Sequence, residues 1–137
     1  MIEFTNVVKS YTVGNKALKG VSMQIEDGEF AFLVGPSGSG KSTVARCIMN
    51  VYKPTSGKIF YNGIDVCDKA QFRKHRKMLE SSRQIIFQDS TSSLNQRMKV
   101  ADIIAEPMYI HRIKPPRGNL RAEAEFQLKY VGMDAGY

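Results

Sequence analysis

The sequence predicts an α/β protein in which a mixed part of strands and helices is followed by a helical part. Alternating apolar residues mark two strands near the amino terminus, and an apolar run enters a glycine-rich loop that precedes an amphipathic helix. Two further stripes of apolar residues at helical spacing follow residue 99. We therefore expect part of a mixed α/β core over residues 1–99 and the beginning of a helical subdomain over residues 100–137.

Composition limits the class of protein. The 137 residues are 42% hydrophobic and 24% charged, which is typical of one soluble globular domain. The longest apolar run, residues 30–34, is far shorter than the roughly 20 residues of a membrane-spanning helix. The first residues lack the features of a signal peptide, so we expect a cytoplasmic protein without direct membrane insertion. Cys47 and Cys67 are too few for a disulfide framework, and we expect two buried thiols.

The charge balance is basic. Twenty Lys and Arg residues against thirteen Asp and Glu residues give a net charge of +7, which favours anionic partners without selecting among them. The densest basic cluster, residues 73–77, has no interleaved aromatic residues that would stack on nucleic-acid bases. A solvated basic face is therefore favoured over nucleic-acid binding.

The spacing of apolar residues predicts the first three strands and the first helix. Residues 2–8 and 21–25 alternate between apolar and polar positions, which predicts two antiparallel strands. Residues 29–34 are almost wholly apolar, which predicts a buried parallel strand. Residues 44–51 carry apolar side chains at i, i+3, i+4 and i+7, and we expect Pro54 to close this helix.

The remaining elements alternate between strands and helices. Residues 58–61 run into an Asn62-Gly63 pair, which predicts a strand entering a tight hairpin turn. A polar helix or loop over 69–80 precedes a short buried strand over 84–88, and residues 90–93 mark an irregular connection.

Two helical stripes complete the chain. The first predicts a helix in which Pro107 introduces a kink or break, and the second predicts a helix that follows a turn at 115–118. The apolar positions of the two stripes are Val100, Ile103, Ile104 and Met108, and then Leu120, Ala124, Leu128 and Val131.

One sequence motif indicates a binding site. Residues 35–43 match G-x-x-x-x-G-K-[ST], a phosphate-binding P-loop, between a predicted strand and a predicted helix. Glycines let backbone N–H groups approach an anion at the helix start, Lys41 adds a full charge, and the hydroxyl of Ser42 is placed to ligate Mg²⁺. A plain glycine-rich turn is the alternative, which the flanking strand and helix disfavour. The expected phosphate-binding residues are Gly35, Pro36, Ser37, Gly38, Ser39, Gly40, Lys41, Ser42 and Thr43.

Two further positions are candidates for the same site. Gln88 ends the predicted strand over 84–88, where open α/β sheets present ligand-binding residues, and its amide is suited to contact Mg²⁺ or a water molecule. Tyr11 precedes the loop and offers an aromatic ring for stacking on a base. Each of the two is weak evidence alone, because a tyrosine is more often a core or surface residue and a glutamine after a strand is more often a loop residue.

Taken together, these residues resemble the first half of an ATP-binding cassette (ABC) transporter ATPase, within the branch that energises dipeptide, oligopeptide or nickel import. The likeness covers essentially the whole chain, although Ser90 and Gln96 stand where proline is expected in that branch. The residues that carry it are Tyr11, Gly28-Glu29-Phe30, the P-loop 35–43, residues 54–59, Gln88-Asp89 as the Q-loop, residues 92–95 and residues 103–107.

The resemblance implies an antiparallel β subdomain, part of a RecA-like core and the first helices of an α subdomain. It implies ATP and Mg²⁺ as cofactors, with Tyr11 stacking on adenine, Ser42 and Gln88 at the metal, and Gln88 as the γ-phosphate sensor. No catalytic residue is expected in this chain, since the family's signature, Walker B and switch-histidine segments normally follow its last residue, and neither His75 nor His111 fits the switch position.

The resemblance also implies partners. These are transmembrane permease subunits and a second ATP-binding subunit, in a homodimer or heterodimer on the inner face of the cell membrane. Two alternatives remain at this point. A small P-loop kinase would use Arg112, Arg117 and Arg121 as its lid, and a nucleic-acid-binding module would use residues 73–77.

Overall fold

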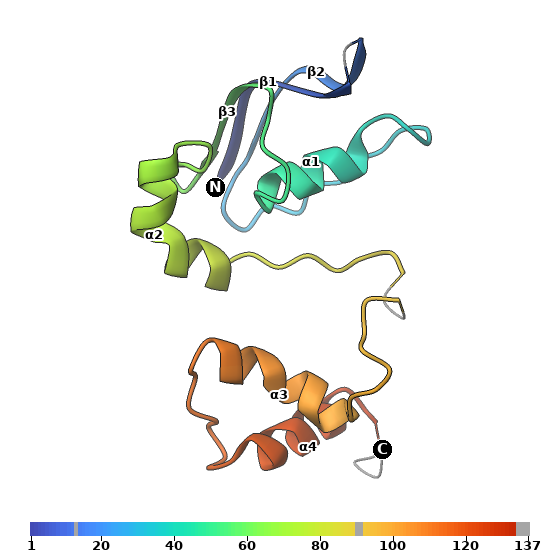
Figure 1. The fold of residues 1–137 in the computed structure, drawn as a ribbon, viewed down its shortest axis with the longest axis vertical. Coiled ribbons are helices and arrows are strands. Elements are labelled where there is room, and N and C mark those ends of the chain that lie inside the picture. The colour runs from blue at the N-terminus through green and yellow to red at the C-terminus, as the bar shows by residue number, and fades with distance from the viewer. Residues whose placement is uncertain (13, 90–91, 134–137) are drawn as a thin grey trace. The chain divides into compact units, whose positions relative to one another are not determined.

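The structure, a computed structural model, describes residues 1–12, 14–89 and 92–133, and the chain divides into two compact units, residues 1–85 and 86–137. The predicted boundary after residue 99 stays a prediction. Among the described residues, no helix is long and apolar enough to cross a membrane. The elements in chain order (Figure 1) are β1 (Ile2–Thr12), β2 (Asn15–Ile25), α1 (Lys41–Ile48), β3 (Ser56–Tyr61), β4 (Ile64–Asp65), α2 (Lys69–Ser81), α3 (Val100–Ile110) and α4 (Leu120–Tyr130).

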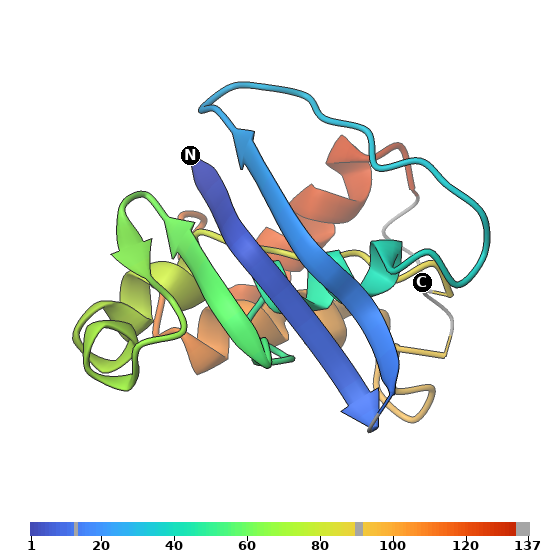
Figure 2. The ribbon, with the colours of Figure 1, turned by 90° about the horizontal axis from the view of Figure 1, so that it is seen from above.

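The first unit is built on a four-stranded antiparallel sheet in the order β2-β1-β3-β4, with the long strands side by side in Figure 2. On β1, Phe4 lies opposite Met23 of β2 and Ile59 of β3. The predicted hairpin turn is confirmed, because Asn62 and Gly63 both have positive φ, at 48° and 76°. The two predicted amino-terminal strands are confirmed as well.

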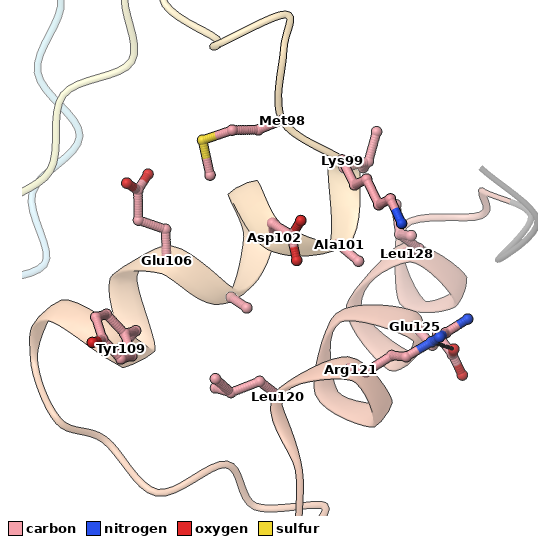
Figure 3. A pocket seen from close by; sticks show the side chains of 12 residues that line it. Met98, Lys99, Ala101, Asp102, Glu106, Tyr109, Leu120, Arg121, Glu125 and Leu128 are labelled. Atoms are coloured by element: carbon pink, nitrogen blue, oxygen red, sulfur yellow. Dashed lines mark hydrogen bonds and ion pairs between the residues drawn. The ribbon is translucent and has the colours of Figure 1, made fainter.

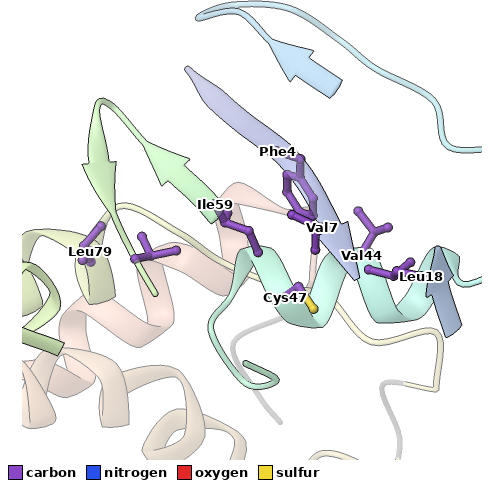
Figure 4. Packing of buried hydrophobic residues seen from close by; sticks show 8 residues of the cluster. Phe4, Val7, Leu18, Val44, Cys47, Ile59 and Leu79 are labelled. Atoms are coloured by element: carbon purple, nitrogen blue, oxygen red, sulfur yellow. The ribbon is translucent and has the colours of Figure 1, made fainter. Parts of the chain in front are cut away.

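The core of this unit lies between the sheet and α1. Figure 4 shows Val44 and Cys47 of α1 facing Val7 and Leu18 of the sheet, all of them buried. Burial raises the pKa of the Cys47 thiol, in agreement with the expected buried cysteine. Cys67 is only partly buried, so the expectation of two buried thiols is wrong for this residue.

The carboxyl ends of α1 and α2 share one guanidinium group. Arg83 donates from Nη1 to the carbonyl of Ile48 at 2.6 Å and from Nε to the carbonyl of Leu79 at 2.8 Å. Its Cζ lies 5.4 Å from the ring centroid of Tyr61. Burial lowers the pKa of Arg83, and the carbonyl ends of the two helices supply the negative partial charge that compensates for it.

A bulge in β1 explains one glycine of β3. Asn6 has φ 49°, and a Cβ atom at Gly57, whose φ is 86°, would lie 2.3 Å from the carbonyl oxygen of Asn6. We expect Gly57→Ala to lower the free energy of unfolding by about 2–4 kcal/mol in urea titrations, from left-handed strain and backbone overlap together. Gly63→Ala is the control, because its φ is also positive but nothing lies within 4 Å of the methyl group that the substitution adds. Equal losses of unfolding free energy in the two variants would contradict the overlap between the added methyl group and the backbone of Asn6.

Two predicted strands do not form. Residues 29–34 and 84–88 lie outside any strand, and Phe30 is 82% and Ile86 92% exposed. A buried parallel strand needs a hydrogen-bonding neighbour at its edge and packed layers on both faces, and no described strand pairs with either segment. Their apolar character therefore predicts burial that the described residues do not provide.

The end of the helix α1 also differs from the prediction. The helix stops at Ile48 rather than continuing toward Pro54. Asn50 adopts φ 59° and donates its N–H to the carbonyl of Cys47 at 3.0 Å, which ends the helix in a left-handed cap. Val51, predicted on the helix, lies beyond it and is 62% exposed.

The second unit contains the two predicted helices, joined as a hairpin. Pro107 lies inside α3 without ending it, and Asn119 caps α4 by accepting the N–H of Ala122 at 2.7 Å. Glu123 is buried, and hydrogen bonds from Gln127 and Arg117 hold the pKa of its carboxyl below the usual range. Ser90 and Thr91, where the irregular connection is predicted, lie outside the described residues.

Candidate functional site

The predicted P-loop leads directly into α1. Gly40 is the N-cap residue with φ 96°, and a Cβ atom there would lie 2.6 Å from the carbonyl oxygen of Ala17. Among the described residues, no side chain caps this helix, and no acidic residue occupies its first turn. The amino-terminal N–H groups and the positive end of the helix dipole are therefore left to bind an anion.

The loop folds around the side chain of Lys41. Its Nζ donates to the carbonyl oxygens of Gly35 and Pro36, each at 2.7 Å, and to the hydroxyl of Ser39 at 3.2 Å. Among the ion pairs of the described residues, none includes Lys41. The full charge of the ammonium group is thus held at the loop without an acidic residue to neutralise it.

The next two residues of α1 face different surroundings. Ser42 is exposed on the first turn of the helix, whereas Thr43 is buried. The hydroxyl of Thr43 shares a 3.0 Å hydrogen bond with the hydroxyl of Tyr11. The structure therefore brings the predicted base-stacking residue against the helix that begins at the predicted phosphate site.

Tyr11 is held at the end of β1. The residue is 50% exposed, and its ring lies edge to face with the ring of Tyr52, with 5.6 Å between centroids. Neither Tyr52 nor the nearby Lys9 is among the site residues predicted from the sequence. The i, i+2 spacing of Lys9 and Tyr11 on one strand is the signal that places them on the same face.

Gln88 lies in the second unit and is exposed. Its position relative to the P-loop is not determined by the structure, so its role at the metal stays a prediction. Among the described residues, no group of three or more His, Cys, Asp and Glu side chains forms a metal site.

A cavity of about 800 Å³ lies between α3 and α4 (Figure 3). Leu120 and Leu128 give it an apolar side, and Arg121 pairs with Glu125 at 3.1 Å on its rim. None of the predicted phosphate-binding residues lines it, so it is separate from the candidate site.

The residues at the start of α1 fit a nucleotide with a bound Mg²⁺ ion. A helix end without a cap or acidic residue and an unneutralised lysine suit phosphate oxygens, and an exposed hydroxyl on the first turn is an oxygen donor of the kind that Mg²⁺ prefers. This arrangement defines the class as P-loop nucleotide-binding proteins.

Comparison with known proteins gives the family. Residues 18–135 match the model described as "ABC transporter", and the chain belongs to this family. The oligopeptide transport ATP-binding protein OppF of Bacillus subtilis is 40% identical over 121 residues, which are 87% of this chain and 39% of OppF. The dipeptide transport ATP-binding protein DppF of Lactococcus lactis is 36% identical over 98% of this chain and 44% of DppF. The chain thus spans less than half of these relatives.

Solved structures agree with the fold. The ATP-binding cassette MJ0796, in a dimeric post-hydrolysis state bound to ADP and Pi, is 30% identical and superposes with a TM-score of 0.70 over 94% of this chain and 56% of that one. The predicted α/β fold, the amino-terminal half of an ABC ATPase, is confirmed.

The alternative of a small P-loop kinase is not supported by these matches. Two of the three arginines considered for a kinase lid are already paired, Arg117 with Glu123 at 2.8 Å and Arg121 with Glu125 at 3.1 Å.

Proposed function

We propose that this chain is the ATP-binding part of an importer subunit that couples ATP binding and hydrolysis to the uptake of peptides or a similar solute. The observation that carries the proposal is the uncapped start of α1 with Lys41 held inside the loop. Family membership supports the ATPase, and the relatives named for oligopeptide and dipeptide transport support the solute class.

Each predicted site residue has a role in this proposal. The backbone N–H groups of residues 35–43 and the ammonium of Lys41 bind the phosphates, and the ring of Tyr11 stacks on adenine. Ser42 and Gln88 hold Mg²⁺, which neutralises phosphate charge when bound. No catalytic residue is assigned in this chain; Gln88 acts as a sensor of the γ-phosphate.

The proposed partners are transmembrane permease subunits and a second ATP-binding subunit. The dimeric cassette MJ0796 supports pairing of two such chains. The chain would act in the cytoplasm at the inner face of the cell membrane, and no nucleic-acid partner is proposed. Co-purification with a permease in detergent tests the first partner, and failure to co-purify would contradict it.

The Ser42→Ala variant tests the site through the metal. In excess Mg²⁺, we expect about a tenfold loss of affinity for a fluorescent ATP analogue, measured by anisotropy, because one metal ligand is removed. In EDTA, the variant and the parent are expected to bind alike, since the hydroxyl acts through the metal. Ser81→Ala removes a hydroxyl from an exposed position on α2, outside the predicted site, and as the control it is expected to bind like the parent in both conditions. An equal loss with and without Mg²⁺ would contradict the assignment.

A further inference from the structure

Two tyrosines and a lysine form a cluster beside α1. Lys9 Nζ lies 5.7 Å from the ring centroid of Tyr11 and 5.6 Å from that of Tyr52, within the range of cation–π attraction. The two rings touch edge to face, with 5.6 Å between their centroids. One ammonium group therefore holds two rings that already contact each other.

The cluster is anchored from its far side. The backbone N–H of Tyr52 donates to the carbonyl of Arg46 at 3.2 Å, and Arg46 Cζ lies 5.5 Å from the ring of Tyr52. The ring of Tyr52 packs against the core cluster of the first unit. Lys9 Nζ also donates to the carbonyl of Lys53 at 2.7 Å. Neither Tyr52 nor Lys9 is therefore a freely rotating surface side chain.

These contacts connect Tyr11 to α1 at two points. Its own hydroxyl meets Thr43, near the start of the helix, and its ring meets Tyr52, which is held by Arg46 nearer the end. A tyrosine at a strand end would otherwise lose rotamer freedom when a ligand immobilises it. Contacts that fix the ring beforehand remove that loss from the binding step.

We propose that Tyr52 and Lys9 are positioning residues that hold the ring of Tyr11 in place for the base of a nucleotide bound at the P-loop. The inference rests on the proposed function and adds two residues to it. The inference assigns the base and the phosphates of the nucleotide to different residues. Tyr52 and Lys9 affect binding of the base through Tyr11 alone, whereas Lys41 and the loop bind the phosphates.

The test compares a ligand that has a base with one that has none. Affinities of the 137-residue chain are measured for a fluorescent ATP analogue and, by competition, for inorganic tripolyphosphate. For Tyr52→Leu we expect a roughly three- to tenfold loss for the ATP analogue, the value of one aromatic pair, and no change for tripolyphosphate. Lys9→Met removes the ammonium group together with its hydrogen bond to the carbonyl of Lys53, and it is expected to lower the affinity for the ATP analogue roughly two- to fivefold.

Tyr52→Phe keeps the ring and is expected to restore the affinity of the parent. Tyr61→Leu is the matched control, since Tyr61 also packs against the core and an arginine, but lies opposite Ile2 at the other end of β1. An equal loss for both ligands in Tyr52→Leu and Lys9→Met, or no loss in either variant, would overturn the inference. If the parent bound neither ligand, the result would contradict the proposed function itself.

Discussion

Lys41→Ala is expected to weaken binding of Mg-ATP roughly 10- to 100-fold, the value of a hydrogen bond to a charged group. Lys41 carries the full charge in the loop, and its Nζ already lies within 2.7 Å of the loop carbonyls of Gly35 and Pro36. A phosphate bound at the start of α1 would be close to this ammonium group. Titration of the parent and the variant with a fluorescent ATP analogue measures the difference.

The control for this experiment is Lys74→Ala, which removes the same charge from an exposed position on α2. The affinity of Lys74→Ala is expected to stay within about twofold of the parent, because Arg83 joins α2 to the carboxyl end of α1, about 12 Å from Gly40, and exposed charges more than about 10 Å apart are largely screened by salt. Equal affinities of Lys41→Ala and the parent would mean that residues 35–43 are not the phosphate site.

Self-association of the chain is the second large expected effect. Phe30, Phe32 and Val34 are 82%, 79% and 84% exposed, next to an apolar groove of about 400 Å³ between β2, residues 31–33 and α1. Burying one such phenylalanine contributes about 1.5–3 kcal/mol. Light scattering is expected to show oligomers of the parent and a monomer for the Phe30→Glu, Phe32→Glu double variant.

The matched control changes two other exposed aromatic residues, Tyr109 and Tyr130, each 77% exposed in the second unit, to glutamate. This variant carries the same added charge and is expected to associate like the parent. A compact, monodisperse parent at high concentration would show that the apolar segment is covered within one chain.

Local signals in the sequence predict much of the fold. The alternation in β1 and β2, the Asn62-Gly63 turn and the stripes of α3 and α4 each depend on neighbours within a few residues, and these elements are confirmed. The exception is Val131, the last residue of the second predicted stripe, which lies beyond the end of α4 and is 66% exposed. The segments 29–34 and 84–88 show where such signals are insufficient. Apolar side chains favour a buried strand, but the strand forms only when another strand is available to pair with its backbone.

The residues of the candidate site also differ in how far the sequence predicts them. The loop over 35–43 is local, because its glycines, lysine and hydroxyl are consecutive, and the motif identifies all of them. The contacts of Tyr11 with Thr43 and Tyr52 join residues far apart in sequence, and no spacing rule identifies them. The relation of Gln88 to the loop stays a prediction, because these residues belong to separate units.

The guanidinium of Arg83 has an electrical consequence for the other end of α1. The helix has only eight residues, or about 12 Å, and Arg83 is buried at its carboxyl end, where the negative potential of the carbonyl groups is screened less than that of an exposed charge. A cation 2.6 Å from the carbonyl of Ile48 cancels much of that potential. For a phosphate bound at the loop as proposed, the helix would act more as a single positive pole than as a pair of opposite poles, and Arg83 at the far end of the helix would contribute to the attraction.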